Sequence, residues 1–204
     1  MYALVKNNLV TKLFTYPKGF ELNNIQYSSD IFSKWSTAEK NAIGIYEVVT
    51  DSTNKKDEKW YINTNETIAF ADNQVTRSWG TATPKKPEDE NAVDEDGNNI
   101  LDEDGNQVIN YGLKTQLIKT IKEQASGLLA PTDWYVIKAS EVSDYSVPTN
   151  IATYRASVRT KSNEMETAIT NASDTPALET LYTYTEQDDG SVTRPLGELP
   201  TLES

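Results

Sequence analysis

The sequence predicts an α+β fold in four parts: a small N-terminal module of β-hairpins with one helix, an acidic linker, a helical region and a C-terminal extension. The N-terminal module, residues 1–83, carries short apolar runs separated by turn residues. The linker, residues 84–111, is rich in acids and contains a repeated turn sequence. Apolar residues at helical spacing mark residues 112–172, and the extension, residues 173–204, follows them.

Two hairpins are predicted in the N-terminal module. The first turns at Asn7-Asn8, because asparagine tolerates the positive φ angles of a two-residue hairpin turn. The second turns at residues 71–73, between runs rich in β-branched and aromatic residues. A polar loop is expected through residues 23–24. The strands predicted to flank the two turns are residues 2–6, 9–13, 67–70 and 74–79.

One helix is predicted between these hairpins. Ser36 as N-cap and Glu39 three residues later form a capping box, and Gly44 supplies a left-handed stop. Residues 45–49 should leave that stop as a strand. A charged turn then leads to a second short apolar run at residues 60–62.

The composition changes after residue 83. Pro84 and Pro87 are incompatible with a central strand. The sequence Asp-Glu-Asp-Gly-Asn occurs at residues 94–98 and again at 102–106, so the two copies form a double turn that we expect to project as a finger. A calcium loop would need a carboxylate at its first position, where either alignment of the repeat places an apolar residue, so solvated turns are favoured.

Helical spacing appears at residues 113–128, with Gly127 as a plausible terminator. Residues 129–131 break the chain, Thr132 is predicted to cap a second helix, and Pro148 to lie in the first turn of a third. In the C-terminal extension, residues 177–184 are expected to form a short helix or strand, and the tail from residue 188 a surface strap or a frayed end. The third helix should present one apolar face, made of Ile151, Tyr154, Val158, Met165, Ile169 and Ala172.

Charge and composition exclude several classes of function. The chain has 19 Lys and Arg against 31 Asp and Glu, a net charge of −12, which disfavours nucleic acid and anionic membranes as partners. No apolar run approaches the roughly 20 residues needed to span a bilayer, and the N-terminus does not resemble a signal peptide. We therefore expect a protein made in a cytoplasm.

The chain contains neither cysteine nor histidine. Thiolate nucleophiles, Ser-His-Asp triads and the commonest zinc sites are thus excluded within it, and we expect no enzyme activity, no cofactor and no metal. A carboxylate pair could still hydrolyse a glycoside, but no spacing singles one out among 31 acids. Trp35, Trp60 and Trp79 could stack on a sugar in a glycan-binding module, or equally form the core of the N-terminal module.

A resemblance to a known family comes from residues 128–137, Leu-Leu-Ala-Pro-Thr-Asp-Trp-Tyr-Val-Ile, followed by Val-Pro at 147–148 and Tyr-Arg at 154–155. This order resembles the C-terminal region of phage tail-fibre assembly proteins and tail assembly chaperones, over residues 113–172. The resemblance implies a non-enzymatic protein that binds phage tail or tail-fibre proteins in the host cytoplasm during virion assembly. The alternative is a structural subunit retained in the virion, because residues 138–144 lack the family's arginine and acidic-glycine turn.

The candidate partner-binding residues follow from this segment. Trp134 and Tyr135 could form an interface hot spot, or Trp134 could lock the helical hairpin together. Tyr154 belongs to the same motif. Arg155 and Arg159 lie four residues apart on one helix face, where both could clamp an acidic partner segment. They could instead pair internally with the carboxylates of Asp133, Glu141 or Asp144. Self-association of the chain is left open.

Overall fold

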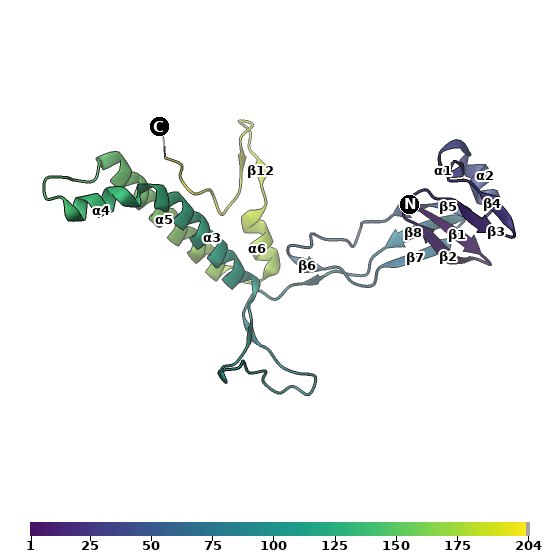
Figure 1. The fold of residues 1–204 in the computed structure, drawn as a ribbon, viewed down its shortest axis with the longest axis horizontal. Helices are drawn as coiled ribbons and strands as arrows, with labels where there is room; N and C mark the ends of the chain where they lie inside the picture. The colour runs from purple at the N-terminus through teal and green to yellow at the C-terminus, as the bar shows by residue number, and fades with distance from the viewer. Residues whose placement is uncertain (203–204) are drawn as a thin grey trace. The chain divides into compact units, whose positions relative to one another are not determined.

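A computed structural model describes residues 1–202 of the chain (Figure 1). Both helices and strands are present, which confirms the α+β prediction. The chain divides into two compact units, the first being Met1–Thr83 and the second beginning at Pro84. Within residues 1–202, no helix is both long and apolar enough to cross a membrane.

The first unit is built on a five-stranded sheet in the order β2-β1-β5-β8-β7. Both predicted hairpins are confirmed: β1 pairs with β2 and β7 with β8, all antiparallel, while β5 and β8 are parallel. The turn residues Asn7, Asn8, Asp72 and Asn73 have positive φ angles between 50° and 61°. The strands of this sheet are β1 (Tyr2–Lys6), β2 (Leu9–Phe14), β5 (Ile45–Thr50), β7 (Thr67–Ala71) and β8 (Gln74–Ser78).

The prediction of a polar loop through residues 23–24 is wrong. Asn23 and Asn24 have φ angles of 52° and 61° and form the turn of a third hairpin, made of β3 (Phe20–Leu22) and β4 (Ile25–Tyr27). The alternation of Phe20 and Leu22 turns both side chains into the core. Three-residue strands are too short to give a clear periodic signal in the sequence.

The helix signals of this unit are confirmed. Ser36 caps α2 (Thr37–Ala42), its hydroxyl accepting from the Glu39 amide while the Glu39 carboxylate accepts from the Ser36 amide. Gly44 ends the segment with a φ of 82° and leads into β5. A shorter helix, α1 (Ile31–Lys34), precedes α2.

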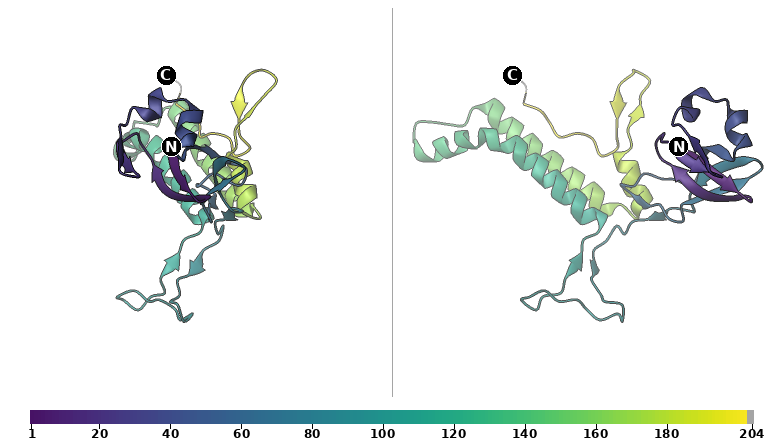
Figure 2. Two further views of the ribbon diagram at one scale, coloured as in Figure 1. Left: turned by 90° about the vertical axis from the view of Figure 1, so that its right-hand side faces the viewer. Right: turned by 45° about the vertical axis from the view of Figure 1, so that its right-hand side comes forward.

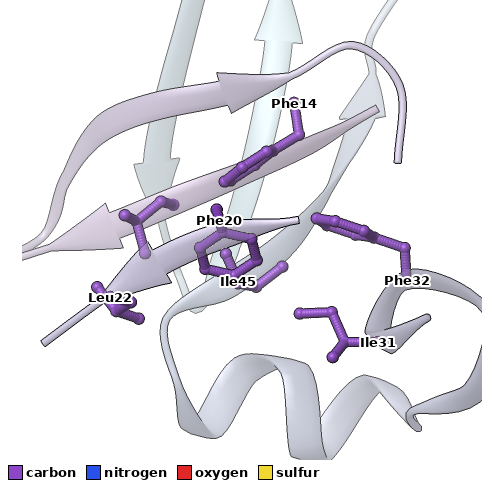
Figure 3. Close-up of a cluster of buried hydrophobic side chains, with 7 residues drawn as sticks. Phe14, Phe20, Leu22, Ile31, Phe32 and Ile45 are labelled. Atoms are coloured by element: carbon purple, nitrogen blue, oxygen red, sulfur yellow. The ribbon is translucent and has the colours of Figure 1, made fainter. Parts of the chain in front are cut away.

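One core of the first unit is mainly aromatic (Figure 3). The rings of Phe14 and Phe20 lie 4.8 Å apart, and those of Phe14 and Phe32 lie 5.3 Å apart. This cluster joins β2, the third hairpin and α1. A second cluster, around Ala3, Val48 and Val75, lies apart from it. A short strand, β6 (Tyr61–Ile62), pairs with β9 (Thr83–Pro84).

The acidic repeat folds into a finger with two lobes, residues 92–100 and 100–108. The short paired strands β10 (Glu90–Asn91) and β11 (Ile109–Asn110) connect the finger to the rest of the chain. Its base is a closed ring of three backbone hydrogen bonds. The Ala92 amide donates to the Val108 carbonyl, Ile100 to Ala92, and Val108 to Ile100, at 2.8–2.9 Å. The eight-residue period of the repeat places these three residues at equivalent positions, so each copy returns the chain to the same base.

The linker also caps the first helix of the second unit, α3 (Leu113–Leu129). Gly112 is the N-cap and has no side chain to offer. Asp89 replaces it: its carboxylate accepts from the Gly112 amide at 2.7 Å and from the Thr115 hydroxyl at 3.0 Å. A carboxylate at a helix N-terminus satisfies free amides and interacts favourably with the helix dipole.

The helical region contains α3, a 3-10 turn η1 (Ala130–Thr132), α4 (Asp133–Glu141), α5 (Thr149–Asn171) and α6 (Thr175–Tyr182). In the right-hand view of Figure 2, α3 and α5 run side by side. The predicted apolar face of α5 is confirmed, since all six of its residues are buried. Leu196, in the C-terminal extension, is also buried, and a small hairpin of β12 (Thr185–Glu186) and β13 (Val192–Thr193) precedes it.

Three predicted helix boundaries need correction. Gly127 does not end α3, which continues to Leu129 because Leu128 and Leu129 pack against the cluster around Tyr154. Pro148 is the N-cap of α5 and lies just outside its first turn, with a ψ of 138°. Thr132 occupies the position before α4, but its side chain makes no capping hydrogen bond.

Candidate functional site

Helix α4 exposes its apolar side chains. None of its nine residues is buried, and the exposed fractions of Trp134, Val136 and Ile137 are 51%, 43% and 55%. Val142, directly after the helix, is 45% exposed. A helix of a globular protein normally buries an apolar stripe, and contiguous exposed apolar surface marks interaction sites. We call Trp134, Val136, Ile137 and Val142 the α4 apolar residues.

Trp134 is held at the surface by its neighbours. Its ring centroid lies 3.9 Å from that of Tyr135, which is half-buried, with 33° between the ring planes. The ammonium group of Lys138 lies 5.7 Å from the Trp134 ring and 4.2 Å from that of Tyr145. The alternative in which Trp134 locks the helical hairpin is therefore wrong, because about half of this side chain faces solvent.

Arg155 fixes the corner between α3 and α4. Its Nη2 lies 2.7 Å from a carboxylate oxygen of Asp133, and its Nη1 donates to the Leu129 carbonyl at 2.9 Å and to the Thr132 hydroxyl at 2.6 Å. The Thr132 hydroxyl in turn donates to the Leu129 carbonyl, which explains why it does not cap α4. The internal pairing predicted for Arg155 is confirmed. Its side chain is only 8% exposed, so assigning it to the partner-binding surface is wrong.

Tyr154 requires the same correction. It is buried with Ala125 and Val158, and its hydroxyl donates to the Leu128 carbonyl at 3.3 Å. Tyr154 and Arg155 thus hold the end of α3 against α5 and support α4 from below. The tyrosine-arginine pair of the sequence motif is part of the scaffold, whereas Trp134, Val136 and Ile137 of the motif are exposed.

Arg159 lies one turn further along α5 and is exposed. Its guanidinium donates to the Arg155 carbonyl at 3.3 Å, and no carboxylate within residues 1–202 forms an ion pair with it. Internal pairing is therefore wrong for Arg159. The residue lines a groove of about 400 Å³ between α3 and α5, whose other lining residues are Lys122, Ala125, Ser126, Leu129, Asp133, Arg155, Ser162 and Asn163.

The tryptophans of the first unit do not form a sugar-stacking surface. Trp60 and Trp79 are buried, and Trp35 is half-buried with its ring edge against Tyr27, 5.9 Å between centroids. Of the two interpretations that the sequence left open, the structure supports core packing.

The acids of the finger serve its turns. The Asp94 carboxylate accepts from the amides of Asn98 and Asp96, and these hydrogen bonds, with that of Asn98 strongest, lower the pKa of Asp94. The Asp102 carboxylate makes the equivalent bonds in the second copy, and its pKa is lowered in the same way. Within residues 1–202, no group of three or more acidic side chains is placed to hold a metal ion.

Part of this site was not predicted from the sequence. Val136, Ile137 and Val142 were not among the candidates, although positions 134, 136 and 137 fall within an arc of about 160° on a helix that turns about 100° per residue. That spacing gives α4 one apolar side, but it does not tell whether this side packs against the fold or faces solvent. Lys122 was missed because only the packing of α3 on α5 brings it beside Arg159.

No family model, no curated protein and no solved structure matches the chain.

Proposed function

We propose that the protein binds other proteins of a phage tail or tail fibre during virion assembly, with α4 as the contact surface. The observation that carries the contact is that α4 buries none of its residues and leaves Trp134 and Ile137 exposed. The resemblance of residues 113–172 to tail-fibre assembly proteins and tail assembly chaperones supports the class of partner.

The geometry suits the recognition of an apolar segment. Trp134 and Ile137 lie one turn apart on α4, and tryptophan is among the residues most enriched in interface hot spots. The corner below them is fixed by Arg155, so α4 loses little freedom when a partner binds. The acidic finger and C-terminal extension keep the complex soluble through their net negative charge.

Several carboxyl groups within residues 1–202 have displaced pKa values. The carboxyl groups whose pKa values are displaced are all lowered, chiefly by hydrogen bonds within their own turns. In Glu66 the cause is the hydrogen bond from Arg77. A general acid at neutral pH needs the opposite displacement, produced by burial or by a second carboxylate.

The contact is tested by co-expression with neighbouring tail genes followed by pull-down. The variant Trp134→Ser/Ile137→Ser should lose co-purification of the tail partner, with affinity falling by at least about tenfold. Tyr16→Ser is the matched control, because Tyr16 is a large side chain with 61% exposure in the first unit. Retention of the partner by the α4 variant at the wild-type level would refute α4 as the contact.

Mass spectrometry of purified virions tests when the protein acts. A protein that assists assembly and departs should be absent or far below one copy per tail structure. Its presence in stoichiometric amounts would assign the alternative role, a structural subunit that remains in the virion.

A further inference from the structure

The groove between α3 and α5 is a basic site in an acidic unit. Three cations line it, of which Arg155 is neutralised by Asp133 at 2.7 Å. Lys122 has a half-buried partner, Glu166, at 3.4 Å. Within residues 1–202, Arg159 has only a backbone carbonyl as acceptor. Because a guanidinium has five N–H donors that match a carboxylate, the groove offers an open position for an acidic group.

Apolar surface continues from the groove along α3. A second hollow of about 440 Å³ shares Lys122 and Ser126 with the groove and includes the half-buried Ile118. Lys119 also lines it, together with its ion-pair partner Glu123, which lies 3.9 Å away. The combined surface therefore places an apolar side chain between cations, which favours a ligand that carries an apolar residue beside its carboxylates.

Each of the two lobes of the finger carries an exposed apolar side chain beside carboxylates. Val93 and Leu101 occupy equivalent positions in the two lobes and are 50% and 57% exposed. Each directly precedes three consecutive acids, at residues 94–96 and 102–104. Gly97 and Gly105, with φ angles of 84° and 83°, close the two turns. The ordered base presents both lobes without a further ordering cost on binding.

We propose that this groove binds the finger of a second copy of the chain. Carboxylates of one lobe would contact Arg159 and Lys122, and Val93 or Leu101 would cover Ile118. Charge complementarity favours this occupant: residues 84–111 contain nine acids and two lysines, whereas residues 112–172 contain seven Lys and Arg and six acids. None of the α4 apolar residues takes part, so this contact is independent of the proposed partner-binding surface.

The symmetry of the contact follows from its two different surfaces. A finger that binds a groove leaves one free finger and one free groove on every pair. Such a heterologous contact continues from copy to copy and either closes into a ring or extends as a filament.

Self-association of the full chain is the first test. Light scattering after size-exclusion chromatography, over about a hundredfold range of concentration, should show a mass that rises with concentration. The association should weaken as salt rises from about 50 to 500 mM, because exposed charge pairs are screened. A monomer at every concentration overturns the proposal, as does association that salt strengthens, since that behaviour belongs to apolar contacts.

Two variants separate the two surfaces. Arg159→Glu reverses the charge of the groove. The finger variant Glu95→Gln/Asp96→Asn/Glu103→Gln/Asp104→Asn neutralises the lobes and keeps Asp94 and Asp102, whose side chains hold the turns. Each variant alone should self-associate at least about tenfold more weakly than wild type. Lys6→Glu, an exposed lysine in the first unit, is the matched charge-reversal control and should associate normally.

Mixing the two variants is the decisive experiment. The Arg159→Glu chain keeps its finger and the finger variant keeps its groove, so the mixture should form a one-to-one pair that grows no further. No pairing in the mixture, or undiminished self-association of Arg159→Glu, overturns the proposal. The tail-protein pull-down of the finger variant should remain at the wild-type level, which keeps failure of this contact distinct from failure of the α4 contact.

Discussion

The two units of the chain differ in the interactions that stabilise each of them internally. The first unit contains nine Lys and Arg and nine Asp and Glu, whereas the second contains ten against 22, so the whole net charge of −12 belongs to the second. Aromatic packing organises the first unit, where the rings of Phe14, Phe20 and Phe32 meet. In the second unit, polar side chains fix the backbone at two places: Asp89 at the start of α3 and Arg155 at the corner between α3 and α4.

This difference explains where each unit leaves apolar surface. The first unit directs Trp60 and Trp79 into its interior. In the second unit, Arg155 and its hydrogen-bond acceptors secure the corner, so Trp134 is not needed to fasten it and stays exposed. Because the polar interactions of Arg155 stabilise the corner, the Trp134 side chain stays available for contact with another molecule.

The largest expected effect comes from substituting tryptophan in the two units. Trp79→Ala should destabilise the first unit by about 3–5 kcal/mol, because it leaves a cavity in the core. Trp134→Ala should change the free energy of unfolding by no more than about 0.5 kcal/mol. Urea unfolding followed by circular dichroism measures both. Equal losses in the two variants would contradict the comparison between the units.

Substitution of Arg155, at the corner between α3 and α4, should have the next largest effect on the free energy of unfolding. Arg155→Ala removes the donor for the Leu129 carbonyl and the Thr132 hydroxyl and should cost roughly 2–3 kcal/mol. Arg159→Ala, one turn away, removes an exposed side chain and should cost less than about 0.5 kcal/mol. Hydrogen exchange of the α3 and α5 amides compares the two, and similar protection in both variants would show that the corner does not depend on Arg155.

Substitution of two glycines of the second unit should change its stability in opposite directions. A Cβ atom at Gly112 would collide with the backbone carbonyls of Glu88 and Pro87, so Gly112→Ala should destabilise the unit by about 1–3 kcal/mol. Gly127 lies inside α3 with open space around it, and Gly127→Ala should stabilise the helix by about 0.5–1 kcal/mol. Thermal melting of the two variants should therefore shift in opposite directions.

The smallest effect is a local loss of order in the finger at low pH. Because the folded-state pKa values of Asp94 and Asp102 are lowered, their stabilisation of the turns is present above the unfolded value of about 3.9. That stabilisation is lost as the pH falls through the folded pKa. Amide exchange at Asn98 and Asn106 should accelerate in this range, and Asp94→Asn should remove the pH dependence in the first lobe alone. Unchanged exchange in wild type would contradict the role of these carboxylates.

Local signals in the sequence predicted much of the fold. Asn7-Asn8 and the Ser36–Glu39 capping box act through neighbouring backbone, so their effect can be inferred without tertiary contacts. The prediction failed where tertiary packing decides. Gly127 looks like a helix end, yet packing of the following leucines carries α3 past it.

The candidate site was harder to predict for the same reason. The motif includes both Trp134 and Arg155, but residue type alone does not tell which of them is covered. Burial of Arg155 depends on α5 meeting the end of α3. Exposure of Trp134 depends on the fact that no element within residues 1–202 covers it. Both facts are properties of the assembled helices.

The ring at the base of the finger has a further consequence. Ala92, Ile100 and Val108 tie the two lobes to one another, so they are displayed as a linked pair at a set spacing. Any surface that captures one lobe meets the other at a high effective concentration, and the second attachment becomes an intramolecular step. A duplicated turn of eight residues thus converts a weak acidic motif into a bivalent one.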